Sequence, residues 1–434
     1  MSKPARSPAS SPARTPQAIS PARVAAFEIL TRVGEGKGHS DELLHSHLTN
    51  SLSPEDRNLA TALVMGVLRW QIALDAQIAS LLSRPGQRLA EPVAIALRLG
   101  AFQLQHMDRI PAHAALNESV ELCRAAGQPH AAGMVNAILR KLTRATPAGA
   151  KLYELPAAFA ERLAHPRWLV ERWAANYGRE AALAICEYDQ QEPQQGSLFP
   201  DAQPDEELPE IDDGSRLVAE IAASAAQGVA HPRVWDACAA PGGKTWVLAA
   251  RLPQAGILAT DISARRLAAM QRRLERTRYA GQVESRVMDA AAAGPLGEFE
   301  LILCDVPCSG TGTLARNPEI RLRLGATDLA RHSARQREIL RGAVDRLAPG
   351  GRLIYASCSL EPEENEVVVE DVLASAPVHQ IPIRPLLERV ATAGALLPGV
   401  REQLLTTAVR RDALRTLPGV QRCDGFYAAV LERN

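Results

Sequence analysis

The spacing of hydrophobic residues changes near residue 230, and this change divides the chain. Before it, apolar residues recur every three or four positions, which is the period of an amphipathic helix. Val24, Phe27 and Leu30 show this spacing directly after Ser20-Pro21, a pair that suits a helix N-terminus. After residue 230, short apolar runs alternate with helical segments, which is typical of a parallel sheet with helices on both faces. The pattern therefore predicts an all-helical front and an α/β back.

The front domain is expected to span residues 20–145. Ser53-Pro54-Glu55-Asp56 is typical of a helix start with an acidic first turn, and apolar residues follow it at helical spacing through Leu68. Further helices are predicted at about 71–82, 90–107, 112–125 and 130–144. Residues 1–19 are rich in Ser, Pro and Ala with scattered Arg, and are expected to form a disordered tail.

Residues 150–230 carry a weaker signal and are expected to be a linker or a reduced middle subdomain. A helix is predicted from Pro166 to Tyr177. The stretch 189–213 is rich in acidic residues, Gln and Pro. It is expected to be a flexible, solvated insertion.

The α/β domain is expected to span residues 231–434. Strands are predicted near 233–237, 256–260, 283–288, 299–304 and 351–356, and helices near 244–251, 263–278, 328–347 and 362–375. Residues 425–431 are expected to form a last strand, antiparallel at the sheet edge.

Composition is that of an ordinary soluble protein of more than one domain. The chain has 434 residues, of which 46% are hydrophobic and 23% charged. No apolar run approaches the roughly 18 to 20 residues of a membrane helix, and residues 1–20 lack a signal core. We therefore expect a cytoplasmic protein, monomeric and without a membrane partner. The seven cysteines include no CxxC pair, so neither a disulfide framework nor a metal site is expected.

Charge is unevenly distributed along a chain that is neutral overall, with 49 basic and 49 acidic residues. Residues 1–150 have an excess of Lys and Arg, whereas Glu180 to Ser215 contains acidic residues and no basic one. Because steering depends on the local field, this distribution weakly favours a polyanionic partner on selected surfaces.

A glycine-rich turn follows the first predicted strand of the α/β domain, in DACAAPGGKT at 236–245. Its two glycines allow a ligand to approach the backbone at a helix N-terminus. A phosphate-binding P-loop needs glycine where Cys238 stands, and no dinucleotide fingerprint G-x-G-x-x-G is present. Both of these nucleotide-binding motifs are therefore excluded.

Carboxylates follow four successive predicted strands, and any one of them alone could be a cap or a loop residue. They are Asp236, Asp261, Asp289 and Asp305. The carboxyl ends of parallel strands line one crevice, and a carboxylate after the second strand is suited to ribose hydroxyls. The order predicts a site for a nucleoside-type cofactor.

Two cysteines each follow an apolar strand-like run: Cys308 in DVPCSGTG (305–312) and Cys358 in YASCSL (355–360). A thiolate is suited to add to an electron-poor ring carbon, and two thiols in one pocket can divide attack from release. Each can equally be a small buried apolar residue. The residues alone leave both interpretations open.

The front domain resembles the NusB-like RNA-binding domain in IPAH at 110–113, NESV at 117–120 and VNAILRKL at 135–142. Arg140, Lys141 and Arg144 end the last predicted helix, where they either bind phosphate or complement the helix dipole. The resemblance covers roughly residues 20–145 and implies an RNA partner.

The α/β domain resembles the RsmB/NSUN family of S-adenosylmethionine-dependent RNA cytosine-C5 methyltransferases. The resemblance rests on DACAAPGGKT, DVPCSGTGT with NPEI at 317–320, ASCSL and PEENE at 362–366. With the front domain it covers most of the chain except about 180–215. It implies a multidomain protein, an all-α NusB-like bundle followed by a Rossmann-like class I S-adenosylmethionine-dependent methyltransferase domain, that modifies a cytidine of small-subunit (16S) ribosomal RNA.

The resemblance also implies residue roles. It assigns attack on cytosine C6 to Cys358, assistance in release to Cys308, and contact with the base near N3 to Asp305. C5 is a poor nucleophile, so a thiolate must first add to C6 before C5 takes a methyl group. Cys304 and Cys238 are expected to be structural. The residues implied to contact S-adenosylmethionine are Cys238, Ala239, Ala240, Pro241, Gly242, Gly243, Lys244, Asp261, Asp289 and Asp305.

Three departures from the family pattern keep other functions in view. Arg321-Leu322 stands where the family commonly has Lys-Trp, Val306 replaces the usual Ala, and the middle region is short and acidic. A non-catalytic RNA-binding or ribosome-assembly factor that retains the fold is therefore the alternative. A DNA methyltransferase is disfavoured, because DNA enzymes attack with the Pro-Cys cysteine and this chain carries Cys358 as well.

Overall fold

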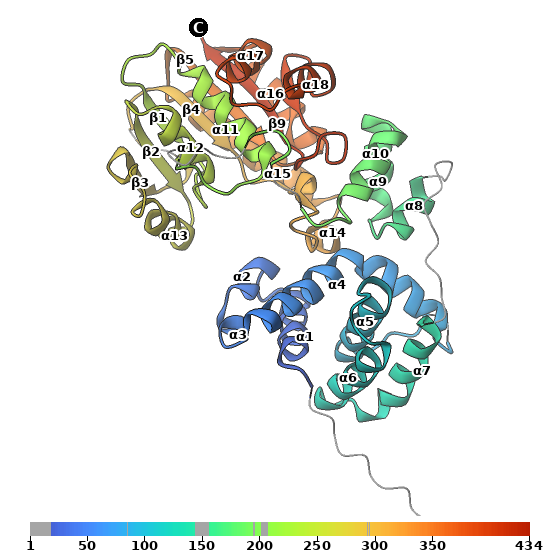
Figure 1. The fold of residues 1–434 in the computed structure, drawn as a ribbon. Helices are drawn as coiled ribbons and strands as arrows, with labels where there is room; N and C mark the ends of the chain where they lie inside the picture. The colour runs from blue at the N-terminus through green and yellow to red at the C-terminus, as the bar shows by residue number, and fades with distance from the viewer. Residues whose placement is uncertain are drawn as a thin grey trace, which may run out of the picture. The chain divides into compact units, whose positions relative to one another are not determined.

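The computed structural model describes residues 19–84, 86–143, 156–193, 196–200, 207–292, 294 and 296–434. The chain divides into two compact units, Met1–Tyr153 and Glu154–Asn434, which we call the helical unit and the α/β unit (Figure 1). The predicted tail lies outside the described residues, apart from Ile19. Arg144 lies outside them as well.

The helical unit is all α in its described residues. Its helices are α1 Pro21–Gly34, α2 Ser40–Leu44, α3 His47–Asn50, α4 Pro54–Leu81, α5 Glu91–His106, α6 Ala112–Ala125 and α7 Ala132–Leu142. Ser53 caps α4 by accepting a hydrogen bond from the Asp56 N–H at 3.1 Å, as its sequence predicts. The two helices expected before and after residue 70 are one continuous helix, since no breaker separates them.

Helix α4 corrects the expectation that no segment is apolar enough to cross a membrane. By length and composition it meets that test. Half of its most apolar stretch is buried, however, and it packs against α1 and α5. Within the helical unit α4 therefore has the surroundings of a core helix.

The α/β unit begins with three helices that share a core with the sheet domain. They are α8 Pro156–Arg162, α9 Arg167–Tyr177 and α10 Arg179–Tyr188. Trp173 of α9 is fully buried among residues that include Leu314, Leu360 and Leu417. The apolar faces of these helices pack into this core, which builds them into the unit. The domain limits drawn from the sequence stay predictions.

The acidic stretch 189–213 is likewise anchored in its described residues. Leu198 and Phe199 are buried in the main core. The Asp213 carboxylate accepts the backbone N–H groups of residues 197 and 198, both at 2.7 Å. Asp212 caps α11 (Asp213–Ala225) and forms an ion pair with Arg316 at 3.0 Å. The expectation of a flexible, solvated insertion is therefore wrong for these residues, because their carboxylates satisfy backbone and guanidinium donors.

A nine-stranded mixed sheet forms the centre of the α/β unit. Its strands are β1 Arg233–Asp236, β2 Gly256–Asp261, β3 Val283–Val287, β4 Phe299–Asp305, β5 Leu347–Ser357, β6 Val378–Ile381, β7 Val409–Arg410, β8 Ala413–Arg415 and β9 Tyr427–Arg433. The order is β3-β2-β1-β4-β5-β9-β8-β7, with β6 also on β9. Strands β1 to β5 pair in parallel, so the order reverses between β1 and β4, where such sheets bind ligands.

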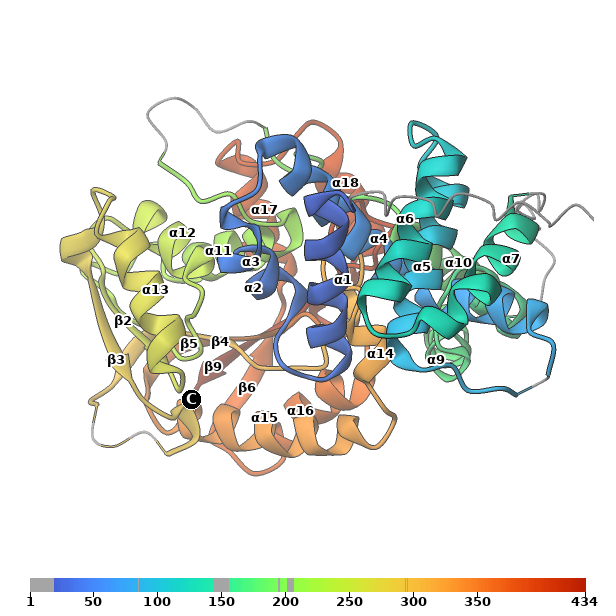
Figure 2. The same cartoon turned by 90° about the horizontal axis from the view of Figure 1, so that it is seen from below.

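Helices cover both faces of the sheet (Figures 1 and 2). Neighbouring strand residues alternate between the faces, so Val234 and Leu301 pack on one core and Trp235 and Ile302 on the other. The first face is covered by α11, α12 Gly243–Arg251, α13 Ala264–Leu274, α17 Arg384–Thr392 and α18 Val400–Thr407. The second is covered by α15 Asp328–Val344 and α16 Glu366–Leu373, and the short α14 spans Ile320–Arg323.

The expected last strand is antiparallel, as predicted, but it is not an edge strand. β9 lies between β5 and β8 and also pairs with β6. The sequence did not predict β6, β7 and β8, because strands of two to four residues have too few positions to show a period. The continuous apolar run of β9 fits its interior position, because a strand that is buried on both faces does not alternate between apolar and polar residues.

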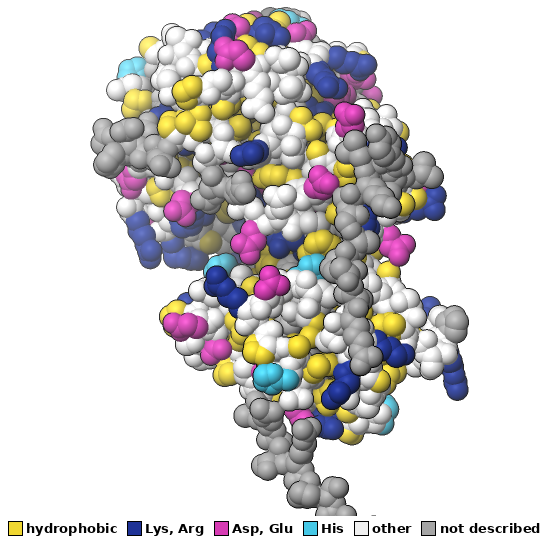
Figure 3. Space-filling view, turned by 45° about the vertical axis from the view of Figure 1, so that its right-hand side comes forward, with side chains coloured by type: hydrophobic (Ala, Val, Ile, Leu, Met, Phe, Trp, Pro, Cys, Tyr) yellow, Lys and Arg dark blue, Asp and Glu magenta, His cyan; other side chains and the backbone are white. Residues whose placement is uncertain are grey.

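Basic residues are concentrated on α13. Leu267, Met270 and Leu274 form its buried face, while its four arginines are exposed. Lys and Arg side chains gather on the side of the α/β unit where Figure 1 draws α13 (Figure 3). The neutral chain therefore carries a local positive field on this unit.

Close helix packing in the helical unit gives a stability test. A Cβ on Gly66 of α4 would lie 1.9 Å from Cζ of Phe102, whereas a Cβ on the helical Gly133 would meet nothing within 4 Å. We expect Gly66→Ala to lower the free energy of unfolding of the helical unit by about 1–3 kcal/mol through overpacking. Gly133→Ala should be neutral or stabilising by up to about 1 kcal/mol. Hydrogen exchange of α4 and α5 amides measures both, and equal effects would contradict the packing.

Candidate active site

Two loops that follow neighbouring parallel strands form the centre of the site. Asp305 at the end of β4 pairs with Ala356 of β5, and the Val306 N–H donates to the Ala356 carbonyl at 2.9 Å. Cys308 and Cys358 follow a few residues later on their two strands. The register therefore brings together two thiols that are 50 residues apart in sequence.

The Sγ atoms of Cys308 and Cys358 are 3.3 Å apart, within hydrogen-bond reach. Both side chains are partly exposed, unlike those of Cys123, Cys186, Cys304 and Cys423, which are buried. The pKa of Cys308 is raised well above its ordinary value by the hydrogen bond with Cys358, by burial and by the charges of Cys358 and Glu364.

Lys244 and Asp305 form an ion pair beside the thiols. Lys244 Nζ lies 2.7 Å from the Asp305 carboxylate and donates to Ser215 Oγ at 2.7 Å. Burial alone would lower the pKa of Lys244, but Asp305 outweighs it and raises that pKa, and Cys358 contributes in the same direction. The lysine thus stays charged beside Asp305.

The glycine-rich turn connects β1 to α12. The Ala239 N–H donates to the carbonyl of Thr260 at 2.8 Å, which ties the turn to β2. Gly242 has φ 98°, and a Cβ there would lie 2.3 Å from Met270. Glycine is needed here both for the left-handed backbone and for the close approach.

Two of the strand-end carboxylates remain available to a ligand. Asp261 at the end of β2 accepts the Ala240 N–H at 3.2 Å and the Ser263 N–H at 2.8 Å. A carboxylate has about four acceptor positions, so others remain. Asp289 is about one third exposed and forms an ion pair with Arg335. These two carboxylates are acceptors of a kind that fits the hydroxyl groups of a ribose.

Asp236 does not line the crevice, contrary to the sequence expectation. It is buried and accepts a hydrogen bond from Thr245 Oγ1 at 2.6 Å, which fastens α12 to β1. Burial raises its pKa to about 7. Cys238 borders the same carboxylates, and burial raises the pKa of its thiol, as it does for Cys304. These high pKa values agree with structural roles for both cysteines.

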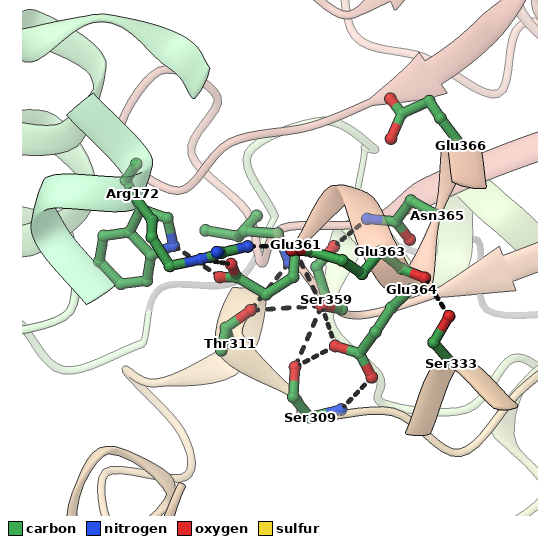
Figure 4. Close-up of polar contacts among 12 residues, drawn as sticks. Arg172, Ser309, Thr311, Ser333, Ser359, Glu361, Glu363, Glu364, Asn365 and Glu366 are labelled. Carbon is green, nitrogen blue, oxygen red and sulfur yellow. Dashed lines mark hydrogen bonds and ion pairs between the residues drawn. The ribbon is translucent and has the colours of Figure 1, made fainter. Parts of the chain in front are cut away.

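A buried carboxylate joins the two thiol loops (Figure 4). Glu364 accepts the Ser309 N–H at 2.8 Å and the Ser359 hydroxyl at 2.5 Å. In Figure 4, Arg172 of α9 reaches the loop that follows Cys358 from the other side. Arg172 lies 2.8 Å from Glu361 and 2.6 Å from Glu363.

Arg321, where the family commonly has lysine, lies away from the thiols. It is 2% exposed, and its guanidinium donates to the carbonyls of Ala164 at 3.2 Å and Leu314 at 3.4 Å. Its forked donors reach both the turn after α8 and the loop after Cys308. The replacement of the family's lysine by Arg321 therefore affects how the helices α8 to α10 are attached to the rest of the α/β unit.

Three residues of the site were missed by sequence reasoning. Ser215 and Phe426 contact Lys244, the latter with its ring centroid 4.9 Å from Nζ. Both lie outside any motif. Glu364 lies in the PEENE segment, but it was assigned no role from the sequence. The cluster of acidic residues shortly after a strand end was a signal that could have pointed to a site residue. Within the described ranges, no group of three His, Cys, Asp or Glu residues is arranged to hold a metal ion.

Known proteins resemble both units. Residues 225–432 match the model described as 16S rRNA methyltransferase RsmB/F, and residues 20–144 match the NusB family. Ribosomal RNA small subunit methyltransferase B of Xanthomonas campestris pv. campestris is 33% identical and covers 94% of this chain and 96% of its own length. The protein of that name from Erwinia tasmaniensis is 32% identical, with coverages of 94% and 97%. The crystal structure of PH0851 shares the fold, with a TM-score of 0.69 at 21% identity, covering 96% and 100%.

The raised pKa of Asp236 gives a pH test of stability. The folded state holds this proton up to about pH 7, the unfolded state only to about pH 4. Its contribution is therefore fully present below about pH 4 and is lost as pH rises to about 7. Between pH 5 and pH 8 we expect the wild type to lose about 2 kcal/mol relative to Asp236→Asn, measured by urea unfolding. Parallel pH curves for the two proteins would contradict the assignment.

Proposed function

The chain belongs to the RsmB/F family of 16S rRNA methyltransferases, and from that premise we propose that it methylates C5 of a cytidine in small-subunit ribosomal RNA. The reaction proceeds through a covalent bond between Cys358 Sγ and cytosine C6. The observation that carries this proposal is the pair of partly exposed thiols, 3.3 Å apart, beside the Lys244–Asp305 ion pair. A buried structural cysteine has no need of such surroundings.

The charges around the thiols support Cys358 as the nucleophile. The charge of Lys244 interacts with Cys358, while the negative charge of Glu364 acts on Cys308. We therefore assign the attack to Cys358. Its Sγ bonds to C6, and the electron pair displaced from the C5–C6 double bond makes C5 nucleophilic.

Cys308 is suited to the release step. After addition, Cys358 is a neutral thioether, so its thiolate charge and hydrogen bond no longer raise the pKa of Cys308, while burial and Glu364 still do. The pKa of Cys308 then falls, and Cys308 can lose its proton to solvent and accept the one that leaves C5. The C5–H electrons restore the double bond as the Cys358–C6 bond breaks, which returns the thiolate.

Asp305 orients the base and Lys244 orients Asp305. The Asp305 carboxylate is about one quarter exposed and accepts from Lys244 Nζ at 2.7 Å. A partly free carboxylate at this place can accept hydrogen bonds from the cytosine edge and support protonation at N3. The lysine holds it there and keeps its charge balanced.

The turn Cys238–Lys244 with Asp261, Asp289 and Asp305 would hold S-adenosylmethionine. When bound, it supplies an electrophilic sulfonium methyl group to the activated C5. Asp261 would accept hydrogen bonds from the ribose hydroxyls, and the glycine-rich backbone at the N-terminus of α12 would allow close approach.

The RNA partner is supported by local charge. The NusB-like helical unit and the exposed arginines of α13 offer phosphate-binding surfaces on a chain with no net charge. C6 is inaccessible within a stacked helix, so the target is an unpaired or extruded base. A cytoplasmic location and a monomeric state stay predictions.

The cysteine roles predict opposite phenotypes for two variants. With S-adenosylmethionine and undermethylated small-subunit RNA, Cys308→Ala should accumulate a protein–RNA adduct that survives denaturing gels, with turnover lowered about 10²–10⁴-fold. Cys358→Ala should form no adduct and transfer no methyl group. If the RNA is labelled but bisulfite mapping finds no protected cytosine, the methyl group is not on C5 and the proposed reaction is refuted. If the two variants show the reverse phenotypes, the roles of Cys308 and Cys358 are exchanged.

Cofactor binding can be tested separately from turnover. We expect Asp261→Asn to raise the Kd for S-adenosylmethionine about 10-fold or more, because a charged hydrogen-bond acceptor contributes roughly 1.5–3 kcal/mol. Asp328→Asn, at the start of α15, should leave the Kd unchanged. Isothermal titration measures both. Binding without turnover on any RNA would favour a ribosome-assembly factor that retains the fold.

A further inference from the structure

The carboxylate of Glu364 lies between the loops that carry the two thiols. It is fully buried. The Ser309 backbone and side chain both donate to it, from the residue after Cys308. The Ser359 hydroxyl donates to it at 2.5 Å, from the residue after Cys358. One side chain thus contacts both neighbours of the thiol pair (Figure 4).

The remaining donor comes from α15. Gln336 Nε2 donates to Glu364 at 3.0 Å and to the Pro307 carbonyl at 3.0 Å. All four donors are uncharged, so they satisfy the oxygens of the carboxylate without neutralising it. A buried charge held in this way acts strongly on its surroundings.

The surroundings of the two thiols differ in sign. Cys308 interacts with Cys358, with Glu364 and with Tyr355 of β5. Cys358 interacts with Cys308 and with Lys244 of α12, whose own partner is Asp305. The negative charge of Glu364 therefore acts on Cys308, and the positive charge of Lys244 interacts with Cys358.

We propose that Glu364 is a positioning residue of the thiol pair: its carboxylate holds the Cys308 loop against the Cys358 loop and places a buried negative charge beside Cys308. The use of the pair in catalysis rests on the proposed function, but this arrangement of the two loops does not. Glu364 touches neither thiol directly in this arrangement. It acts through Ser309 and Ser359 and through its charge.

Glu364→Gln separates charge from anchoring. Its amide oxygen can accept from Ser309 N–H and Gln336, and its amide nitrogen can donate to the two serine hydroxyls. We expect site-resolved alkylation by iodoacetamide to modify Cys308 at lower pH in this variant. The ratio of Cys308 to Cys358 modification near neutral pH should rise several-fold. An unchanged ratio and pH profile would overturn the proposal.

Glu363→Gln is the matched control. This neighbour is 42% exposed and pairs with Arg172, away from the thiols. We expect the wild-type alkylation profile from it. A shift equal to that of Glu364→Gln would mean that any charge in this turn suffices, and would also overturn the proposal.

Glu364→Ala tests the holding role. We expect diamide to form the Cys308–Cys358 disulfide several-fold more slowly in this variant than in the wild type or in Glu364→Gln. A wild-type rate in a variant whose circular dichroism is native would overturn that role. If Glu364→Ala does not fold, the Gln variant still decides. These assays use the full chain without RNA or cofactor, so a failure of the methyltransferase proposal would not be confused with a failure of this one.

Discussion

The parallel pairing of β4 with β5 is the constraint on which the site depends. It sets Asp305 level with Ala356, so the loops that follow both strands leave the sheet at one place. Every feature of the site is arranged around that meeting point. The glycine-rich turn comes from β1, the strand beside β4, and brings Lys244 to Asp305. A shift of register would separate the thiols and break this ion pair at once.

The loops are held by close contacts that leave little room for adjustment. The Gly312 N–H donates to the Cys358 carbonyl at 2.9 Å, and a Cβ on Gly312 would lie 2.2 Å from the Gly425 carbonyl oxygen. On the other side, Trp173 donates to Glu361 at 3.0 Å. Thiol chemistry depends on placement to within fractions of an ångström. Segments that are far apart in sequence therefore together fix the positions of the two loops that carry Cys308 and Cys358.

Sequence reasoning predicted the features that have a strong local signal. The parallel strands, the glycine-rich turn and both cysteine loops follow from period and motif, and the structure brings Cys308, Cys358, Asp305 and Lys244 together as the resemblance implied. It misplaced features that depend on tertiary partners. Asp236 is turned inward by Thr245, and the acidic stretch is drawn into the unit by the donors around Asp212 and Asp213. A pattern of charge along a chain cannot show which charges will meet a buried donor.

The interior position of β9 has a consequence for synthesis of the protein. β5 is made long before β9, and until then one of its edges has no antiparallel partner. An open apolar edge invites wrong pairing, and contacts between distant segments form slowly. The cysteine loop at the end of β5 therefore gains its final support only when β9 has joined the sheet. A chain whose synthesis has not yet reached β9 therefore lacks one of the partners that set the position of Cys358.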